Sequence, residues 1–323
     1  MANPYLQRGE WRLSVDLQYR RATAFFRGSQ EQQDLPAVRR TQLRTLTQLS
    51  YGWTERDSLQ LLIPWVDQRL GLGLRPGGSL DSSSVRGLGD LTLSYQHWFR
   101  KPTVFRDSSR VWRGNAAVGF GVKLPTGASS LRDRTLDGTG NNRRLRDVDM
   151  ASQPGDGGVG FLLQARGFQR VGFASVYFSA AYLLNPRNTN DTVSLASNLF
   201  GIGNLPRSAR YNSVADQYLA NVGVAVPLGG AAAGWSLSLA GRIQGVPTHD
   251  LLGRSDGFRF SGYGVAVEPG LRYTRGNSSW EVRFPVTVLR NAGDNRATPG
   301  RDSETFAPFH LEFGYAYRFG RAP

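Results

Sequence analysis

The feature that most constrains this chain is the alternation of apolar residues with polar or very small ones. In residues 11–19 the apolar positions are Trp11, Leu13, Val15, Leu17 and Tyr19, and the intervening positions are Arg12, Ser14, Asp16 and Gln18. Successive side chains of a strand point to opposite faces, whereas an amphipathic helix repeats every three or four residues. A strand with one apolar and one polar face separates two different environments.

The same alternation recurs along the whole chain. Further segments lie near residues 42–54, 58–66, 90–99, 115–124, 161–166, 175–185, 218–226, 235–243, 263–273, 280–288 and 311–319. Each has close to the roughly 10 residues that a tilted membrane strand needs. We therefore expect an all-β protein, a closed antiparallel up-and-down transmembrane β-barrel of about 12 strands that forms one domain over residues 1–323.

The connections alternate between short and long. Tight connections are expected near residues 56–57, 169–172, 228–230 and 275–278, and long polar ones at 28–38, 71–86, 127–157, 186–211, 247–259 and 291–306. Outer-membrane barrels have short periplasmic turns and long extracellular loops, so we expect the long segments outside the cell, 127–157 and 186–211 being the longest. The connection at 100–110 breaks this rule because it should be short.

Aromatic residues gather at the strand ends next to the tight connections. We expect an interfacial girdle there, made of Trp11, Tyr51, Trp53, Tyr95, Phe99, Trp235, Tyr273, Trp280, Tyr317 and Phe319. A soluble β-sandwich is the alternative, but it would leave this apolar surface uncovered. Pro64, Pro269 and Pro285 lie inside expected strands, where we expect bulges.

Composition excludes several other classes. The chain has no Cys and three dispersed His, so thiolate metal sites, disulfides and helical His pairs are ruled out, and we expect no metal and no cofactor. The formal net charge of +14 comes from Arg spread along the chain without a basic patch, so we expect no nucleic acid partner. No apolar run of about 18 residues could form a membrane helix.

The expected setting is the bacterial outer membrane. The partners would be membrane lipid, lipopolysaccharide, the barrel assembly machinery and small-molecule solutes. Met1 is followed by no apolar segment typical of a signal peptide, so we expect a mature or recombinant form.

The polar face of the strands predicts the lining of the lumen. Its charged candidates are Arg12, Asp16, Arg20, Arg44, Asp90, Lys123, Arg166, Arg242, Glu268, Arg272, Glu281, Arg283, His310, Glu312 and Arg318. With His310 neutral, these are nine cations and five anions. They could brace the wall as ion pairs, or they could form a weakly anion-favouring constriction.

Two further functions compete with transport. An outer-membrane hydrolase would need a Ser and a His on neighbouring strands; His310 shares a face with Glu312, but no Ser stands out, so we expect no catalytic residue and no enzyme. A structural or adhesive barrel without transport is the third class. The acids of 127–157 do not match a calcium-binding loop, and we expect them to be solvated.

Three short motifs suggest a family. At residues 87–93 (GLGDLTL), 121–127 (GVKLPTG) and 153–157 (QPGDG), and in the strand pair 161–169 and 173–185, the chain resembles the outer-membrane transporter family named after the meta-pathway of phenol degradation. The resemblance extends over roughly residues 59–320. It implies a channel or transporter for small, often hydrophobic or aromatic compounds. The C-terminal Gly320 to Pro323 departs from the usual outer-membrane pattern, in which an aromatic residue is last.

Overall fold

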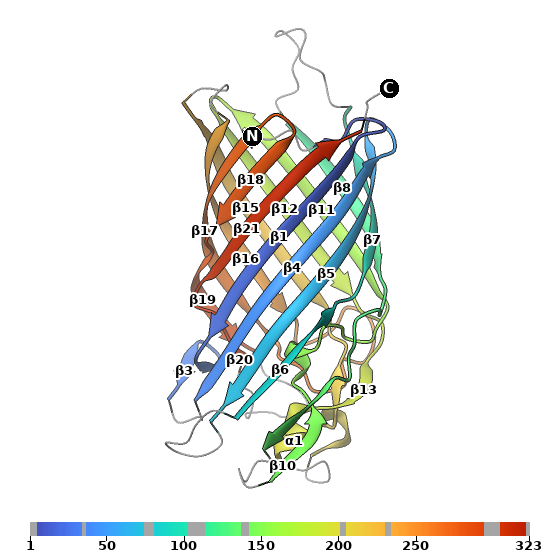
Figure 1. The fold of residues 1–323 in the computed structure, drawn as a ribbon, viewed down its shortest axis with the longest axis vertical. Helices are drawn as coiled ribbons and strands as arrows, with labels where there is room; N and C mark the ends of the chain where they lie inside the picture. Colours follow the sequence, from blue (N-terminus) through green and yellow to red (C-terminus); the bar gives the residue numbers. More distant parts are fainter. Residues whose placement is uncertain are drawn as a thin grey trace.

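A computed structural model describes residues 5–33, 37–73, 81–101, 114–136, 142–200, 205–229, 234–293 and 304–320. Most of the connection 100–110 lies outside these ranges. The described chain is a closed antiparallel β-barrel with twelve membrane strands and almost no helix, which confirms the expected fold class (Figure 1). No helix in these ranges is long and apolar enough to cross a membrane.

Ten of the membrane strands are continuous and two are composite. The continuous ones are β1 (Trp11–Ala22), β4 (Val38–Gly52), β5 (Asp57–Leu72), β8 (Gly114–Lys123), β11 (Gly160–Val171), β12 (Ala174–Leu184), β15 (Gln217–Leu228), β16 (Trp235–Val246), β17 (Gly262–Arg275) and β21 (His310–Phe319). The composite ones are β6 (Asp81–Leu88) with β7 (Thr92–Trp98), and β18 (Ser278–Arg283) with β19 (Val286–Ala292). β1 pairs with both β4 and β21, which closes the barrel.

The prolines lie at the two strand interruptions. In β5, Leu62 pairs with β7 and Trp65 pairs with β6, so Pro64 stands opposite the break. Pro285 lies within the break between β18 and β19, and Pro269 of β17 faces it by accepting a hydrogen bond from the Phe284 N–H. Proline has no N–H for a sheet ladder, so it fits where the neighbouring strand stops. The expected bulges are therefore mainly strand breaks.

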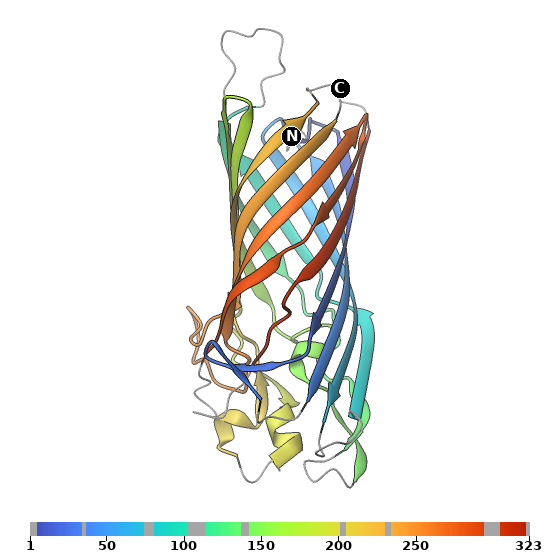
Figure 2. The same ribbon diagram turned by 90° about the vertical axis from the view of Figure 1, so that its left-hand side faces the viewer.

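The tight connections and the long ones lie at opposite ends of the barrel (Figures 1 and 2). β11–β12 and β17–β18 are two-residue hairpins whose first loop residues, Gly172 and Gly276, have φ of 60° and 56°. Positive φ at this position suits the primed turns that join twisted strands. β1 begins and β21 ends at this same end of the barrel.

The long-loop end carries its own small structure. Its elements are β2 (Phe25–Arg27), β3 (Gln30–Gln32), β9 (Arg132–Leu136), β10 (Arg143–Asp147), η1 (Met150–Ser152), β13 (Thr189–Val193), α1 (Leu195–Phe200), η3 (Arg207–Ala209), β14 (Tyr211–Ser213) and β20 (Glu304–Thr305). β5 extends to Leu72 and β6 begins at Asp81, so much of the segment expected as the loop 71–86 is strand. The polar composition of 81–86 concealed a strand that pairs with β5 beyond the apolar band.

The outer face of the barrel is apolar. Exposed large apolar side chains alternate along β8, β11, β16 and β21, among them Phe120, Leu163, Leu239 and Phe313. Rings stack at the tight-turn end across neighbouring strands: Trp11 lies 4.6 Å from Tyr51 between ring centroids, and Trp235 lies 4.6 Å from Tyr273. This surface matches a lipid environment with amphipathic rings at its edge.

The assignment of one strand face to lipid and the other to the lumen can be tested at two neighbouring residues of β11. Leu163 is 46% exposed on the apolar face, whereas Gln164 lies on the opposite face. We expect Leu163→Arg to lower the free energy of unfolding in lipid vesicles by about 2–4 kcal/mol, because the charge enters the hydrocarbon layer. Gln164→Arg should lower it by less, and equal losses in urea unfolding would contradict the assigned facing.

Candidate functional site: the lumen

A cavity of about 770 Å³ occupies the tight-turn half of the barrel interior. It is lined from β1, β4, β7, β11, β12, β15, β16, β17, β18 and β21. Eight of the fifteen charged candidates line it: Arg12, Asp16, Arg166, Glu268, Arg272, Glu281, Arg283 and Arg318. The sequence alternation therefore brings side chains that are distant along the chain around one space.

Arginines and carboxylates form a continuous network across one side of the lumen. Arg242 lies 3.1 Å from Glu268 and 2.8 Å from Glu312. Arg283 lies 3.1 Å from Glu312 and 3.1 Å from Asp16. Arg242, Glu268 and Glu312 are at most 7% exposed, so these charges depend on one another for compensation. Much of the inward charge braces the wall.

Other inward cations make no ion pair with a carboxylate. In the part of the chain that the structure describes, Arg12, Arg20, Arg44 and Arg166 make no ion pair within 4.0 Å. The Nε atoms of Arg12 and Arg20 are buried and have no hydrogen-bond partner in these ranges. Arg20 and Arg44 lie on β1 and β4 toward the long-loop end, near His310. The cationic excess is therefore divided between two levels of the lumen.

Aromatic rings narrow the lumen at the tight-turn end. Tyr5 precedes β1 and lies 4.7 Å from Trp98 and 6.0 Å from Phe168 between ring centroids. The Asn115 side-chain amide donates a hydrogen bond of 2.9 Å to the Tyr5 hydroxyl, which fixes that ring inside the wall. This cluster was not predicted from the sequence, because Trp98 and Phe168 stand on the strand face that was expected to be polar.

The three motifs behind the family resemblance meet at the break between β6 and β7. The Asp90 carboxylate accepts hydrogen bonds from the backbone N–H groups of Gly127 (2.9 Å) and Asp156 (3.1 Å). Lys123 lies 3.6 Å from Asp90 and also contacts Asp156. The Thr126 hydroxyl donates to the Gly89 carbonyl at 3.1 Å. Asp90 and Lys123 thus hold the start and the end of one long loop, residues 124–159, at the break between β6 and β7, away from the main cavity.

Glycine is required where these motifs pack. A Cβ on Gly127 would lie 2.9 Å from the backbone of both Gly155 and Gly89. A Cβ on Gly155 would lie 2.5 Å from the Gly127 carbonyl oxygen. Contacts this short with backbone cannot relax, so the motifs serve close backbone approach.

Outside the membrane span, the acids expected to be solvated are structural. Asp149 is 1% exposed and lies 2.9 Å from Arg40, and Asp147 is 8% exposed and lies 2.7 Å from Arg132. Asp133 accepts a backbone hydrogen bond from Ser84, and Asp137 lies outside the described residues. The solvated-loop prediction was wrong because β9, β10 and η1 fold this segment against the barrel rim.

Arg40 holds a second carboxylate from a different loop. Glu304 of β20 lies 3.8 Å from it, and burial raises the pKa of Glu304 to about 7, although Arg40 opposes the shift. Burial also raises the pKa of Asp149. One guanidinium thus faces two buried carboxylates, and the protonated form of Glu304 is favoured.

This pair predicts a pH dependence of the β2–β20 contact. Unfolded Glu304 releases its proton near its ordinary pKa of 4.5, whereas folded Glu304 keeps it up to about pH 7. The folded state therefore binds more protons in this window, and the stability of the contact falls as the pH rises from about 4.5 to 7. We expect hydrogen-exchange protection of the β20 amides to fall across this window, and Glu304→Gln to remove the fall. Protection that rises with pH would contradict the prediction.

Among the described residues, neither His97 nor His310 makes a hydrogen bond with a serine. His97 Nδ1 lies 2.6 Å from an Asp57 carboxylate oxygen. The Nδ1 of His310 is buried and has no hydrogen-bond partner among the described residues. Within those ranges no group of three or more metal-ligating side chains gathers.

Comparison with known proteins places the fold. No protein-family model and no curated protein matches the chain. Among solved structures, an outer membrane channel from Pseudomonas putida F1 matches with a TM-score of 0.61 and 13% identity over 97% of both chains. The translocator domain of the Neisseria meningitidis autotransporter NalP matches with a TM-score of 0.46 and 11% identity, covering 97% of this chain and 90% of that one. The toluene transporter TbuX of Ralstonia pickettii matches with 0.43 and 11%, with the same coverage of 97% and 90%. The first likeness shows that the chain has the fold of an outer-membrane β-barrel.

Proposed function

We propose that the protein is a passive channel of the bacterial outer membrane for small solutes, including hydrophobic or aromatic compounds. The observation that carries the proposal is a cavity of about 770 Å³ with charged and aromatic walls inside a closed barrel whose outer face is apolar.

The comparisons and motifs support the same assignment. The similar fold from Pseudomonas putida F1 is described as an outer membrane channel. The motif resemblance to the transporter family named after the meta-pathway of phenol degradation suggests aromatic or hydrophobic solutes. Lipid and lipopolysaccharide would surround the barrel, and the assembly machinery would insert it.

The inward charges favour mild anion selectivity. The network around Arg242 and Arg283 is internally compensated, so selectivity would come from the remaining cations. Fixed positive charge in a narrow lumen raises the local concentration of anions.

The test is conductance and uptake by the purified protein in defined membranes. We expect conductance in planar bilayers, with a reversal potential of anionic sign in a salt gradient that weakens at about 1 M salt, where screening shortens to about 3 Å. Liposomes should also take up a radiolabelled aromatic solute such as toluene. Protein-free liposomes are the control. The absence of both conductance and solute uptake would refute transport.

A further inference from the structure

Every carboxylate that lines the main cavity is held by an arginine other than Arg12 and Arg166. Glu10 lies 3.6 Å from Arg318, Asp16 3.1 Å from Arg283, Glu268 3.1 Å from Arg242, and Glu281 2.7 Å from Arg272. Arg12 and Arg166 line the same cavity and make neither an ion pair nor a hydrogen bond within the described ranges. Among the described arginines that line this cavity, these two guanidinium groups are therefore the ones without an ion pair, although Glu10 and Asp16 act on Arg12 from a longer distance.

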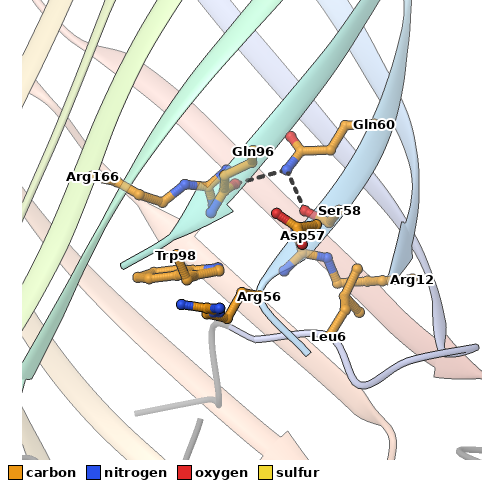
Figure 3. A pocket seen from close by; sticks show the side chains of 9 residues that line it. All are labelled: Leu6, Arg12, Arg56, Asp57, Ser58, Gln60, Gln96, Trp98 and Arg166. Carbon is orange, nitrogen blue, oxygen red and sulfur yellow. Dashed lines mark hydrogen bonds between the residues drawn. The ribbon is translucent and has the colours of Figure 1, made fainter. Parts of the chain in front are cut away.

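The two guanidinium groups face a common space. Arg12 comes from β1 and Arg166 from β11, and both also line a small adjoining cavity with Gln96 and Trp98 (Figure 3). The positive charge of Arg12 acts on Arg166 across this space. The Gln96 side-chain carbonyl already accepts a hydrogen bond of 2.8 Å from Gln60, so it is engaged elsewhere.

An anion bound between Arg12 and Arg166 would reduce the electrostatic repulsion between their positive charges. Two like charges removed from bulk water repel one another unless a counter-charge lies near them. Arg242, Arg272, Arg283 and Arg318 each have a carboxylate within 4.0 Å. Glu10 and Asp16 act on Arg12 only from beyond that distance, and Asp57 of the small cavity is engaged by Thr54, Tyr95 and His97. A guanidinium presents a planar fork of N–H donors that matches a carboxylate, which makes a carboxylate a better fit than a spherical ion.

The aromatic side chains beside Arg12 and Arg166 favour a ligand that carries an aromatic ring in addition to its carboxylate. Trp98 and Phe168 line the cavity with their centroids 6.3 Å apart; Tyr5 packs on both and buries Trp98 to 4% exposure, and Tyr177 lines the cavity next to them, so Phe168 and Tyr177 offer most of the aromatic surface. Aromatic faces contribute apolar area and favourable ring contacts. The volume of about 770 Å³ lies in the range of small-molecule sites and leaves room for a single-ring solute.

We propose that Arg12 and Arg166 form a binding site for small aromatic carboxylates, whose carboxylate lies between the two guanidinium groups and whose ring lies against Trp98, Phe168 and Tyr177. The inference rests on the proposed function, because the ligand reaches the site through the lumen. It names one solute class for the channel, organic anions that carry a ring.

The test is calorimetric titration of the folded protein in detergent with benzoate, benzyl alcohol and acetate. Benzoate carries both the ring and the charge, whereas each of the other two lacks one of them. We expect benzoate to bind about tenfold more tightly than either. Arg12→Gln and Arg166→Gln should each weaken benzoate by about tenfold and leave benzyl alcohol unchanged.

The matched control is Arg170→Gln on the same strand. Arg170 stands four residues from Arg166, is exposed, and donates a hydrogen bond to the Gly172 carbonyl. It should leave benzoate affinity unchanged. Equal weakening by Arg166→Gln and Arg170→Gln would mean general electrostatics and would overturn the site, as would equal affinities for benzoate and benzyl alcohol. Should a glutamine variant fail to fold, Arg166→Lys replaces it, and benzoate affinity unchanged by that variant would also overturn the site.

The failure of this inference can be separated from the failure of the proposed function. Benzoate binding that depends on Arg12 and Arg166, in a protein without conductance or uptake, would uphold the site and refute the channel. Conductance without benzoate binding would uphold the channel and refute the site.

Discussion

Replacement of Arg242 by Met is expected to lower the free energy of unfolding by about 3–5 kcal/mol. Arg242 is 7% exposed and is shared between Glu268 and Glu312, which are 4% and 1% exposed. Its removal leaves Glu268 without its arginine and Glu312 with Arg283 alone. Reversible urea unfolding in lipid vesicles, followed by tryptophan fluorescence, measures the loss.

The control is an ion pair that is exposed to solvent. Arg187 and Asp191 are 3.0 Å apart, but their side chains are 45% and 78% exposed. Arg187→Met should cost about 1–2 kcal/mol, since it removes an exposed ion pair, which contributes little, and two solvent-exposed hydrogen bonds to the carbonyls of Thr189 and Gly157. Adding Glu268→Gln to Arg242→Met should restore part of the stability, because it removes the stranded charge. A loss for Arg242→Met no larger than that for Arg187→Met would contradict a braced lumen.

The fold could be predicted because lipid and lumen impose opposite demands on alternate residues. In the strands from Trp11 to Phe319, apolar and polar residues alternate with a period of two. A shift of the strand register by one residue would place Arg12 or Arg318 in lipid. The same alternation indicates which charges face inward. Local periodicity thus determines the strands and their facing.

Pairing and strand continuity were harder to predict. The alternation predicts that Arg12, Arg242 and Arg283 point into the lumen. Whether each of them pairs with a carboxylate depends on residues that can be hundreds of positions away in the sequence, as for Arg283 and Asp16. The proline signal at Pro64 and Pro285 was visible in the sequence. Its interpretation as a bulge was incomplete. Where the neighbouring strand is interrupted, no carbonyl requires the N–H that proline lacks, so a strand break accommodates proline as well as a bulge does.

The polar loops were the least predictable part. Asp147 and Asp149 look solvated in sequence because their partners, Arg132 and Arg40, lie on other elements. A loop acid becomes structural when folding buries it beside a cation, and no local pattern reports that. The motif residues Asp90 and Lys123 were expected in the lumen lining; they do not line the main cavity, and they hold the loop 124–159 where β6 and β7 separate.

The largest effect outside the Arg242 network is expected at Lys123. Its side chain is 6% exposed and lies between the carboxylates of Asp90 and Asp156, which are 9% and 23% exposed. Lys123→Met would leave two carboxylates facing one another across a buried gap. We expect a loss of about 3 kcal/mol or more in the free energy of unfolding, with early proteolysis of the segment 124–159.

The chain contains its own control for this substitution. Lys101 is the only other lysine, and it pairs with Glu55 at 3.0 Å where the two side chains are 68% and 59% exposed. Lys101→Met should change stability by at most about 1 kcal/mol, whereas Lys123→Arg should retain most of it by keeping the charge. Equal losses for both methionine variants would mean that the three motifs meet without depending on this charge. A selective loss at Lys123, reduced when Asp156→Asn is added, would instead show that ion pairing holds the ends of the loop 124–159 at the point where the β6–β7 strand is interrupted.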